Sequence, residues 1–413
     1  MAGSPTSDVN AHLAGVTGPK PERTTTKVSS LSCGGHVVPL YINEFWTAGQ
    51  RKASSIHEIS YRACFKPQLP RFFIDIMTKS GDVIYDPFSG RGTTVIEAGL
   101  CGRNIITNDA NPLSEIMTRP RFFPPSLGEV EGRLATIPCD GKAGAVDLSM
   151  FYHPETEKEI IALRGYLLYK RERGTEDEID RWIAMIATNR LTGHSSGFFS
   201  VYTLPPNQAV SRESQMRINR KRNQVPEYRN THRLMVKKTR SLLRTLNNSQ
   251  IRALIRAGER ARFLTRDARD TPDIVDDTVQ LTVTSPPFLD IVQYREDNWL
   301  RCWFNGLEGD TIGKTITMAR TVEEWAAVMR DVLSELYRVT APGGWVAFEV
   351  GEVRKGTIRL EEYIVPLGIA AGFACPAVMI NTQTFTKTSH IWGVDNMGCG
   401  TNTNRIIVFR KDT

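Results

Sequence analysis

A short apolar strand that runs into a glycine-rich turn and then a helix is the feature that most constrains this fold. A strand is predicted over 82–85, the sequence Asp-Pro-Phe-Ser-Gly-Arg-Gly-Thr-Thr occupies 86–94, and a helix is predicted over 95–101. Gly102 ends that helix, and a second strand follows at 104–107. This order is typical of a parallel sheet that carries a ligand site at the carboxyl ends of its strands.

The α/β pattern then stops, and residues 115–259 are polar and mostly helical. Helical periodicity is present over 155–173, 176–191 and 229–256. In contrast, residues 193–208 contain Gly, Ser, Pro and aromatic residues, which predicts a loop. A largely helical insertion therefore interrupts the α/β domain.

After residue 260 the α/β pattern resumes. The elements predicted there are strands at 263–264, 280–284 and 345–350, helices at 323–339 and 360–371, and two final strands at 378–383 and 405–410. The last two strands fit an antiparallel hairpin at the sheet edge. The chain thus divides into a disordered tail at 1–35, a first core part at 36–114, the helical insertion at 115–259 and a second core part at 260–413.

Basic residues concentrate in the second half of the insertion. The net charge of the 413-residue chain is +7, yet 15 Lys and Arg against three acids lie between Arg212 and Arg262. Helical basic faces are often merely solvated, but this density is typical of a surface that binds a phosphate backbone. The residues expected to contact nucleic acid are Arg220, Lys221, Arg222, Lys237, Lys238 and Arg240.

Other classes of protein are disfavoured by the composition. No long apolar run occurs, and residues 1–35 lack a basic start followed by an apolar stretch, so neither a membrane span nor a secretory signal is expected. The seven cysteines are widely spaced and form no CxxC pair, which argues against a disulfide framework and a zinc site. We therefore expect a cytoplasmic protein with no metal, associated with the nucleoid if the source is bacterial.

The glycine turn lies where a nucleoside ligand binds in parallel sheets. It is neither GxGxxG nor a phosphate-binding loop with its lysine, so a nucleoside triphosphate is disfavoured. Asp86 ends the first strand and can accept hydrogen bonds from an ammonium group, while Asp109 ends the second and suits two ribose hydroxyls. Asp267 follows a third strand and suits an adenine amino group. The alternative is a plain glycine turn with carboxylates that cap helices.

A second motif, Thr284-Ser285-Pro286-Pro287-Phe288, also ends a predicted strand. The prolines fix the backbone and remove two amide donors, so a hydroxyl and a backbone carbonyl can accept both N–H bonds of an exocyclic amine. Phe288 offers a flat face to a base that has left the helical stack. The alternative is a proline turn without chemistry.

Together, the two motifs resemble those of the amino-group DNA methyltransferases, and the serine form of the second motif is most like the cytosine-N4 branch. The resemblance covers roughly residues 57–115 and 260–410. Shorter segments that also resemble family motifs lie at 65–67, 108–112, 267–269, 297–300 and 403–405. The insertion departs from the family's common motif orders, so its role in target recognition is inferred from its charge and position.

This resemblance implies a Rossmann-like, seven-stranded class I methyltransferase sheet and S-adenosylmethionine as cofactor. The residues that it places around the cofactor are Lys66, Pro67, Asp86, Pro87, Phe88, Gly90, Gly92, Thr93, Asp109, Ala110, Asp267 and Ala268. Those that it places around the flipped base are Ser285, Pro286, Pro287 and Phe288.

The function that the resemblance implies is site-specific methylation of cytosine N4 in double-stranded DNA, by base flipping and direct in-line transfer. Such an enzyme acts alone or beside a separate cognate restriction endonuclease. Three alternatives stay open: adenine-N6 methylation, methylation of RNA amino groups, and DNA binding without catalysis. Pro138-Cys139 resembles the nucleophile of cytosine-C5 enzymes, but no Gln follows it and that mechanism leaves the Ser-Pro-Pro-Phe motif unexplained.

Overall fold

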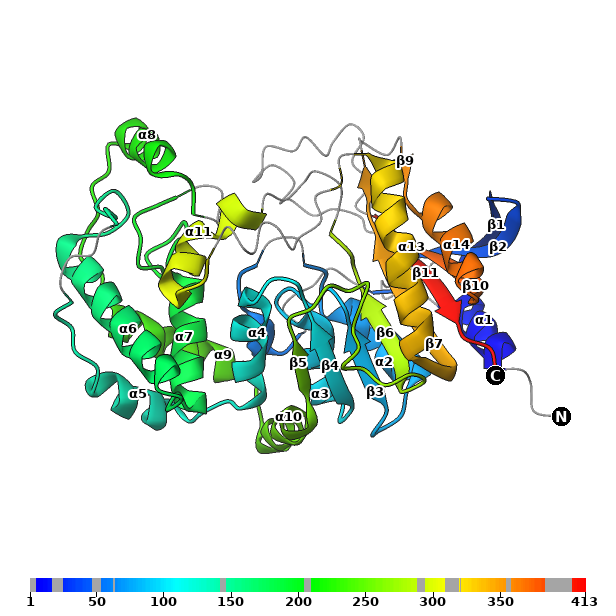
Figure 1. The fold of residues 1–413 in the computed structure, drawn as a ribbon, viewed down its shortest axis with the longest axis horizontal. Helices are drawn as coiled ribbons and strands as arrows, with labels where there is room; N and C mark the ends of the chain where they lie inside the picture. Colours follow the sequence, from blue (N-terminus) through cyan, green and yellow to red (C-terminus); the bar gives the residue numbers. More distant parts are fainter. Residues whose placement is uncertain are drawn as a thin grey trace.

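The protein is built around one large mixed sheet (Figure 1). The structure, a computed structural model, describes residues 5–16, 25–46, 53–61, 64–141, 146–203, 209–287, 294–308, 319, 321–353, 358–382 and 403–413. The sheet has nine strands in the order β1-β2-β10-β11-β7-β6-β3-β4-β5. The strands are β1 (Lys27–Cys33), β2 (His36–Asn43), β3 (Val83–Asp86), β4 (Asn104–Asn108), β5 (Arg262–Leu264), β6 (Val279–Thr284), β7 (Thr340–Val350), β10 (Ala374–Thr382) and β11 (Thr403–Arg410). A separate antiparallel pair is formed by β8 (Glu352–Val353) and β9 (Ile358–Arg359).

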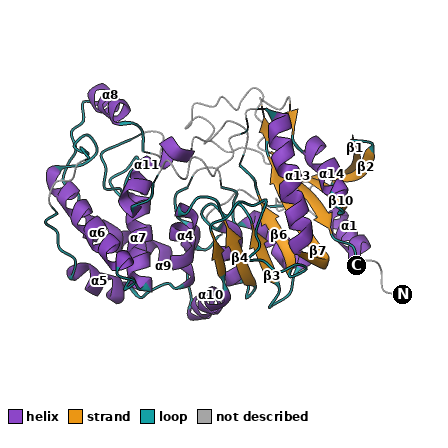
Figure 2. Cartoon of the chain, viewed as in Figure 1, coloured by secondary structure: helices purple, strands orange, loops and turns teal. Residues whose placement is uncertain are grey.

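Helices cover both faces of this sheet (Figure 2). One group packs together on the strands at its centre: α2 (Gln68–Met77), α3 (Thr93–Leu100) and α10 (Asn248–Arg260). The other group is α13 (Val322–Val339) and α14 (Glu361–Ala370), which contact each other and strands β7, β10 and β11. The strands from β10 to β5 form the predicted seven-stranded sheet, so the predicted α/β fold class is confirmed.

The sequence of α13 shows why these helices form where they do. Thr321 caps its first turn in a reciprocal pair of hydrogen bonds with Glu324, of 3.1 and 3.4 Å. Trp325, Met329 and Leu336 then recur at helical spacing on the buried face. Burial of such an apolar stripe against the sheet is the main stabilisation available to a helix of this kind.

Residues 1–35 differ from the disordered tail that the composition predicted. They contain helix α1 (Pro5–Gly15) and strand β1. Val9 and Leu13 lie one turn apart on α1 and are both buried in the core. These two apolar residues attach one face of α1 to the core, although the composition of the segment is otherwise polar.

The final two strands form the predicted antiparallel hairpin, β10 with β11. Their predicted place at the edge of the sheet is wrong, because β10 also pairs in parallel with β2, and β1 forms the edge. β2 therefore pairs with backbone groups that β10 would otherwise expose at the sheet edge, and its side chains Val38 and Tyr41 are buried.

The predicted insertion is mostly helical. Its helices beyond the sheet, here called the helical lobe, are α5 (Leu127–Ala135), α6 (Pro154–Glu172), α7 (Glu178–Arg190), α8 (Arg212–Arg222) and α9 (Thr231–Leu243). The lobe stands to one side of the sheet, beyond β5 (Figure 1). It meets the sheet layers through α4 (Leu113–Thr118) and the short helix η3 (Arg119–Phe122), which both contact α7. The helix that follows the second motif, α11 (Tyr294–Asn305), packs on α6 and α7 and so joins the lobe.

The helix predicted over 229–256 is two helices, α9 and α10. Asn247 breaks the run, because its side chain accepts from the backbone of Gln250 at 2.9 Å and caps a new helix. The break matters for function, since α9 belongs to the lobe while α10 packs on α3 and β4.

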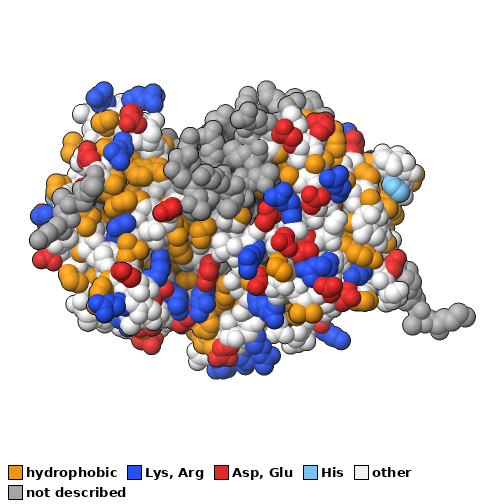
Figure 3. Space-filling view, viewed as in Figure 1, with side chains coloured by type: hydrophobic (Ala, Val, Ile, Leu, Met, Phe, Trp, Pro, Cys, Tyr) orange, Lys and Arg blue, Asp and Glu red, His pale blue; other side chains and the backbone are white. Residues whose placement is uncertain are grey.

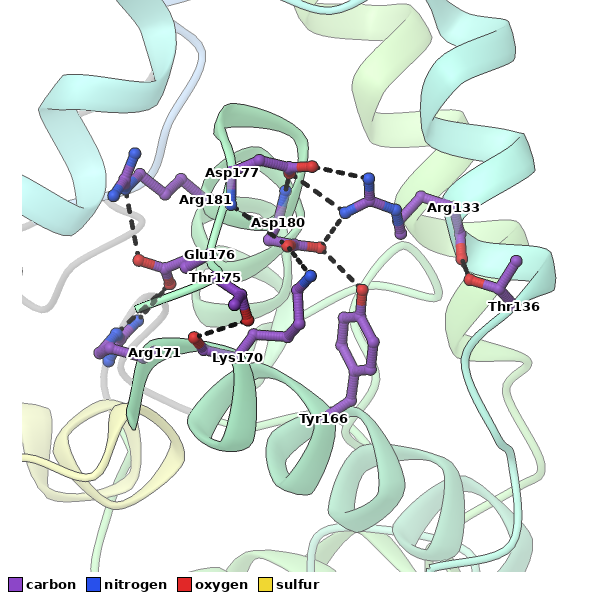
Figure 4. Close-up of polar contacts among 10 residues, drawn as sticks. All are labelled: Arg133, Thr136, Tyr166, Lys170, Arg171, Thr175, Glu176, Asp177, Asp180 and Arg181. Carbon is purple, nitrogen blue, oxygen red and sulfur yellow. Dashed lines mark hydrogen bonds and ion pairs between the residues drawn. The ribbon is translucent and has the colours of Figure 1, made fainter. Parts of the chain in front are cut away.

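A buried carboxylate joins three helices of the lobe (Figure 4). Asp180, at the start of α7, is fully buried. It accepts hydrogen bonds from Arg133 of α5 and from the hydroxyl of Tyr166 of α6, the latter at 3.0 Å. The ammonium of Lys170 lies 3.6 Å from the same carboxylate. The negative charge of Asp180 is therefore neutralised inside the lobe by groups that also fix the packing of α5, α6 and α7.

Candidate active site

Four neighbouring strands bring the predicted motifs to one edge of the sheet. β6, β3, β4 and β5 are adjacent and parallel, so their carboxyl ends lie side by side. Asp86 ends β3, Asp109 follows β4, and Thr284 ends β6. The chain order reverses between β6 and β3, and such a switch point is where open α/β sheets bind ligands.

The glycine turn between β3 and α3 has a backbone that other residues would strain. Gly90 and Gly92 adopt φ of 52° and 72°. A Cβ on Gly92 would lie 2.4 Å from the side chain of Thr118, so neither the conformation nor the space admits another residue. Helix α3 then begins at Thr93, next to the turn. The turn is consequently a close-approach surface for a ligand at the start of a helix.

Asp109 ties this turn to the next strand. Its two carboxylate oxygens accept hydrogen bonds from the backbone amides of Gly90 and Asn111, both at 2.8 Å. Burial raises the pKa of Asp109 to about 6, although both hydrogen bonds favour the charged form. Asp109 therefore orders the glycine turn itself, a role that the strand-end pattern alone did not reveal.

Asp86 is a buried carboxylate with neutral partners. It accepts from the hydroxyl of Thr284 at 2.7 Å and from the amide of Phe88 at 3.2 Å, and its residue is 1% exposed. No Lys or Arg side chain is among its partners in the described part of the chain. Burial raises its pKa to about 7. A carboxylate in this state fits a ligand that brings its own ammonium group.

The second motif is anchored on both sides. The Thr284 hydroxyl binds Asp86, and the Pro287 carbonyl accepts from the indole of Trp325 at 3.0 Å. Ser285 and Pro287 are partly exposed, and Pro286 is buried. Phe288 lies outside the described residues. The two predicted motifs are thus in direct contact through one hydrogen bond between strand ends.

Glu349 is a site residue that the sequence analysis missed. It lies in β7, next to the residue that pairs with Thr284 of β6, and it is buried. Its carboxylate accepts from Asn404 at 2.8 Å and hydrogen-bonds the side chain of Ser285, while burial raises its pKa. A charged residue inside the apolar run Val346–Val350 was the available signal, because strand interiors rarely bury an acid without a reason.

The other residues predicted to bind the cofactor differ in burial and in hydrogen-bond partners. Asp267 is partly exposed and receives two hydrogen bonds from the side chain of Arg269, at 2.9 and 2.5 Å, which lower its pKa. An adenine amino group would therefore share this carboxylate with Arg269. Ala268 is buried and Ala110 partly exposed in their turns, and Pro87 is buried beneath the glycine turn.

Lys66 and Pro67 lie at the start of α2. Burial lowers the pKa of Lys66. Pro67 lines a cavity of about 480 Å³ that is also bounded by Arg71 and Glu97. Glu97 lies on α3 beyond its first turn, so this cavity runs along the helix, away from the glycine turn. The structure does not bring Pro67 into contact with the strand-end carboxylates described above.

The predicted DNA-binding residues fall on two helices of the lobe. Arg220, Lys221 and Arg222 are exposed at the end of α8. On α9, Lys237 and Arg240 are exposed, whereas Lys238 is half-buried and donates to the carbonyl of Glu58. The basic segment also continues into α10, at the opposite end of the face shown in Figure 3 from α8. One basic run in the sequence is therefore several separate surfaces.

Comparisons with known proteins agree with the first half of the site. Residues 35–116 match the family described as DNA methylase (N6_N4_Mtase). The Type II methyltransferase M.BsoBI of Geobacillus stearothermophilus is 40% identical over 74 residues, which are 17% of this chain and 14% of that protein. These matches support the amino-group DNA methyltransferase family. They also support S-adenosylmethionine as the cofactor, since the matched range contains the glycine turn, Asp86 and Asp109.

Solved structures with related folds are more distant. TrmN from Thermus thermophilus has a TM-score of 0.32 at 13% identity, over 86% of this chain and 51% of that chain. Geranyl diphosphate C-methyltransferase from Streptomyces coelicolor A3(2) has a TM-score of 0.35 at 8% identity, over 83% and 78%. At these scores the fold assignment rests on the strand order of the chain itself.

Within the described residues no group of three or more His, Cys, Asp or Glu side chains has the arrangement of a metal site. No helix within them has the length and apolar character needed to cross a bilayer.

Proposed function

We propose that this chain is an S-adenosylmethionine-dependent, site-specific DNA methyltransferase that modifies cytosine N4 in double-stranded DNA. The observation that carries the proposal is the 2.7 Å hydrogen bond between Thr284 and Asp86. This hydrogen bond joins the end of β3, where the glycine turn begins, to the end of β6, where the Ser-Pro-Pro loop begins. Both strand ends lie at the switch point of the sheet. A reaction between a bound cofactor and a base needs these two loops to be adjacent.

The cofactor would be held by Asp86 at its ammonium group, by the turn at Gly90 and Gly92, and by Asp109 at its ribose. When bound, it supplies an electrophilic methyl group. The chain's own contribution is to hold these acceptors in place before the ligand arrives. Asp109 already accepts hydrogen bonds from the amide of Gly90 in the glycine turn and from the amide of Asn111 in its own turn. Asp86 is already fixed by Thr284.

Ser285 and the backbone after it orient the target amine in this proposal. The Ser285 side chain is bonded to Glu349, and a serine oxygen that donates there can accept from an amine N–H with its lone pairs. We assign the carbonyl of Pro286 as a second acceptor, since the two consecutive prolines remove two amide donors from this loop. Glu349, with its raised pKa, is then suited to receive through Ser285 Oγ the proton that the amine loses.

The choice of cytosine rests on the serine at the head of the Ser-Pro-Pro-Phe motif. A target base in a duplex must leave the stack, and we assign Phe288 as the platform that receives it. The lobe then lies beside the site and contacts the DNA backbone through α8. Pairing with a restriction endonuclease is compatible with this assignment and is a question for the gene neighbourhood.

The test is nucleoside mass spectrometry of DNA from cells that express the protein, beside a Ser285→Ala control. We expect N4-methylcytosine with the wild type only, and equal cofactor affinity in both proteins. N6-methyladenine in its place would retain the mechanism and overturn the base assignment. If neither mark appears while cofactor still binds, DNA is the wrong substrate, and the same assay on cellular RNA follows.

A further inference from the structure

Arg190 ends α7 with a buried guanidinium group. The residue is 9% exposed, its Nη2 donates to Asn189 at 2.5 Å, and its Nε is buried without an acceptor. The guanidinium carbon lies 4.0 Å from the ring centroid of Phe198. No carboxylate among the described residues pairs with it. A buried cation of this kind is costly unless an anion joins it.

The charges around Arg190 are also positive. Burial, and then the guanidinium of Arg301, lowers the pKa of Arg190 to about 10. Burial, and then Arg190, lowers the pKa of Lys238 to about 8. Cations from α7, α9 and α11 therefore act on one another at close range, and a bound anion would relieve their repulsion.

A rigid polar loop follows Arg190 directly. Phe198 lies in it, and a Cβ on Gly193 would come within 2.4 Å of the Phe198 ring. Arg229 donates to three backbone carbonyls of the loop, those of Ser195 at 3.2 Å, Phe198 at 2.9 Å and Ser200. His194, Ser195 and Ser196 at the tip are exposed. The ring of Phe198 links this exposed tip to the buried guanidinium, because its centroid lies 6.1 Å from that of His194 and 4.0 Å from the guanidinium carbon of Arg190.

The same loop supports α8. The carbonyl of Tyr202 accepts from Gln215 at 3.1 Å and from Gln224 at 2.9 Å. The guanidinium of Arg222 lies 3.8 Å from the Tyr202 ring centroid. One loop therefore carries two aromatic rings, each with an arginine of a neighbouring helix over it: buried Arg190 of α7 and exposed Arg222 of α8. Stacking fixes the plane of a guanidinium and leaves its N–H edge for a phosphate.

Helix α8 lies on the side of the molecule toward which the carboxyl ends of the central strands point (Figure 1). In Figure 1, α8 lies on the same side of the molecule as β9, which follows the carboxyl end of β7. β7 is parallel to β6, so the catalytic loop opens toward that side as well. Helix α10 lies on the opposite side (Figure 1).

We propose that Arg190 and the loop tip at 194–196 form a seat for one phosphodiester of the bound DNA strand. This inference rests on the proposed function and goes beyond it, because it assigns a phosphate contact to a loop outside the basic segment. A polyanionic strand suits the site better than a small carboxylate, since exposed Arg222 extends the positive surface along the same loop.

The test is binding of a labelled, mixed-sequence DNA duplex at several salt concentrations, with wild type and Arg190→Gln. Loss of one phosphate contact should weaken binding roughly tenfold and reduce the slope of log affinity against log salt by about 1. Arg256→Gln, an exposed change of equal charge on α10, should leave affinity and slope unchanged. An Arg190 that only supports packing would lower the melting temperature without changing the slope.

A second variant covers the case in which Arg190→Gln does not fold. Ser196→Glu places a negative charge at the exposed loop tip and should weaken duplex binding, while Ser249→Glu on α10 should not. Unchanged affinity and slope in both loop variants, with DNA methylation intact, would overturn the seat alone. Loss of cofactor affinity without loss of DNA binding in Arg190→Gln would assign the anion to the cofactor. A wild type that neither binds nor methylates DNA would overturn the proposed function as well.

Discussion

Asp86 in the sheet and Asp180 in the helical lobe are both buried carboxylates, yet their surroundings differ. Asp180 is bonded to Arg133 and lies near Lys170, so its charge is balanced within the protein. Asp86 has a hydroxyl and an amide as partners, and its pKa is raised to about 7. Burial alone therefore does not indicate function. The informative difference is whether the fold itself supplies the opposite charge.

The largest effect is expected from Asp180→Ala. Removing one member of a buried ion pair leaves Arg133 and Lys170 without their shared partner, which typically costs about 3–5 kcal/mol of unfolding free energy. Denaturant unfolding measures this loss. Glu131→Ala, which removes an exposed carboxylate from the same helix as Arg133, is the matched control and should be nearly neutral. A neutral Asp180→Ala would mean that Asp180 is no more structural than Asp86.

Glu349→Gln tests a third buried carboxylate, which we place in the proton path. Glutamine keeps the shape and one acceptor for Asn404 but cannot take up a proton. We expect the methyl-transfer rate to fall by about 10²-fold, within the usual range for loss of a general base. Cofactor affinity and melting temperature should stay close to those of the wild type. An unchanged rate across the pH range would remove Glu349 from the mechanism.

For Asp86→Asn we expect the opposite effect on stability from that of Asp180→Ala. It removes a charge that the fold does not balance, so stability should be maintained or increased. Cofactor affinity should fall about 10- to 100-fold, since a charge-assisted hydrogen bond contributes roughly 1.5–3 kcal/mol. Isothermal titration with S-adenosylmethionine gives the affinity, and thermal melting gives the stability. Strong destabilisation with intact cofactor binding would place Asp86 in the same structural role as Asp180.

The strand-end residues of the candidate site could be predicted from the sequence, whereas Glu349 and Arg190 could not, for a physical reason. The glycine turn, Asp86 and Thr284 are local patterns at strand ends, so strand adjacency alone brought them together. Glu349 meets Ser285 from a neighbouring strand, and Arg190 meets Arg301 across two packed helices. Such contacts depend on packing between segments far apart in the chain, which periodicity does not encode.

The basic segment shows the same limit. The sequence predicts one long basic helix over 229–256, but Asn247 splits it, and α10 lies on a different side of the molecule from α8. Lys238 turns inward to Glu58 for a similar reason, since its position on α9 faces segment 53–61. A count of charges along a sequence therefore overestimates the surface that is available to one ligand.

The smallest change in cofactor affinity that we expect is the one that follows from the pH dependence of Asp86. The pKa of Asp86 is about 7 in the folded protein, against an ordinary value of 3.8 for an aspartate. Between about pH 4 and 7 the folded protein therefore holds a proton on Asp86 that the unfolded chain has lost. Stability should accordingly fall as pH rises through that window, and Asp86→Asn should flatten the decline. An ammonium ligand binds the charged carboxylate, so cofactor affinity should instead rise, about tenfold from pH 6 to pH 8, and less in Asp86→Asn. Cofactor titrations at pH 6 and pH 8 check this. An affinity that falls as the pH rises would contradict the pairing of Asp86 with the ammonium group of the cofactor.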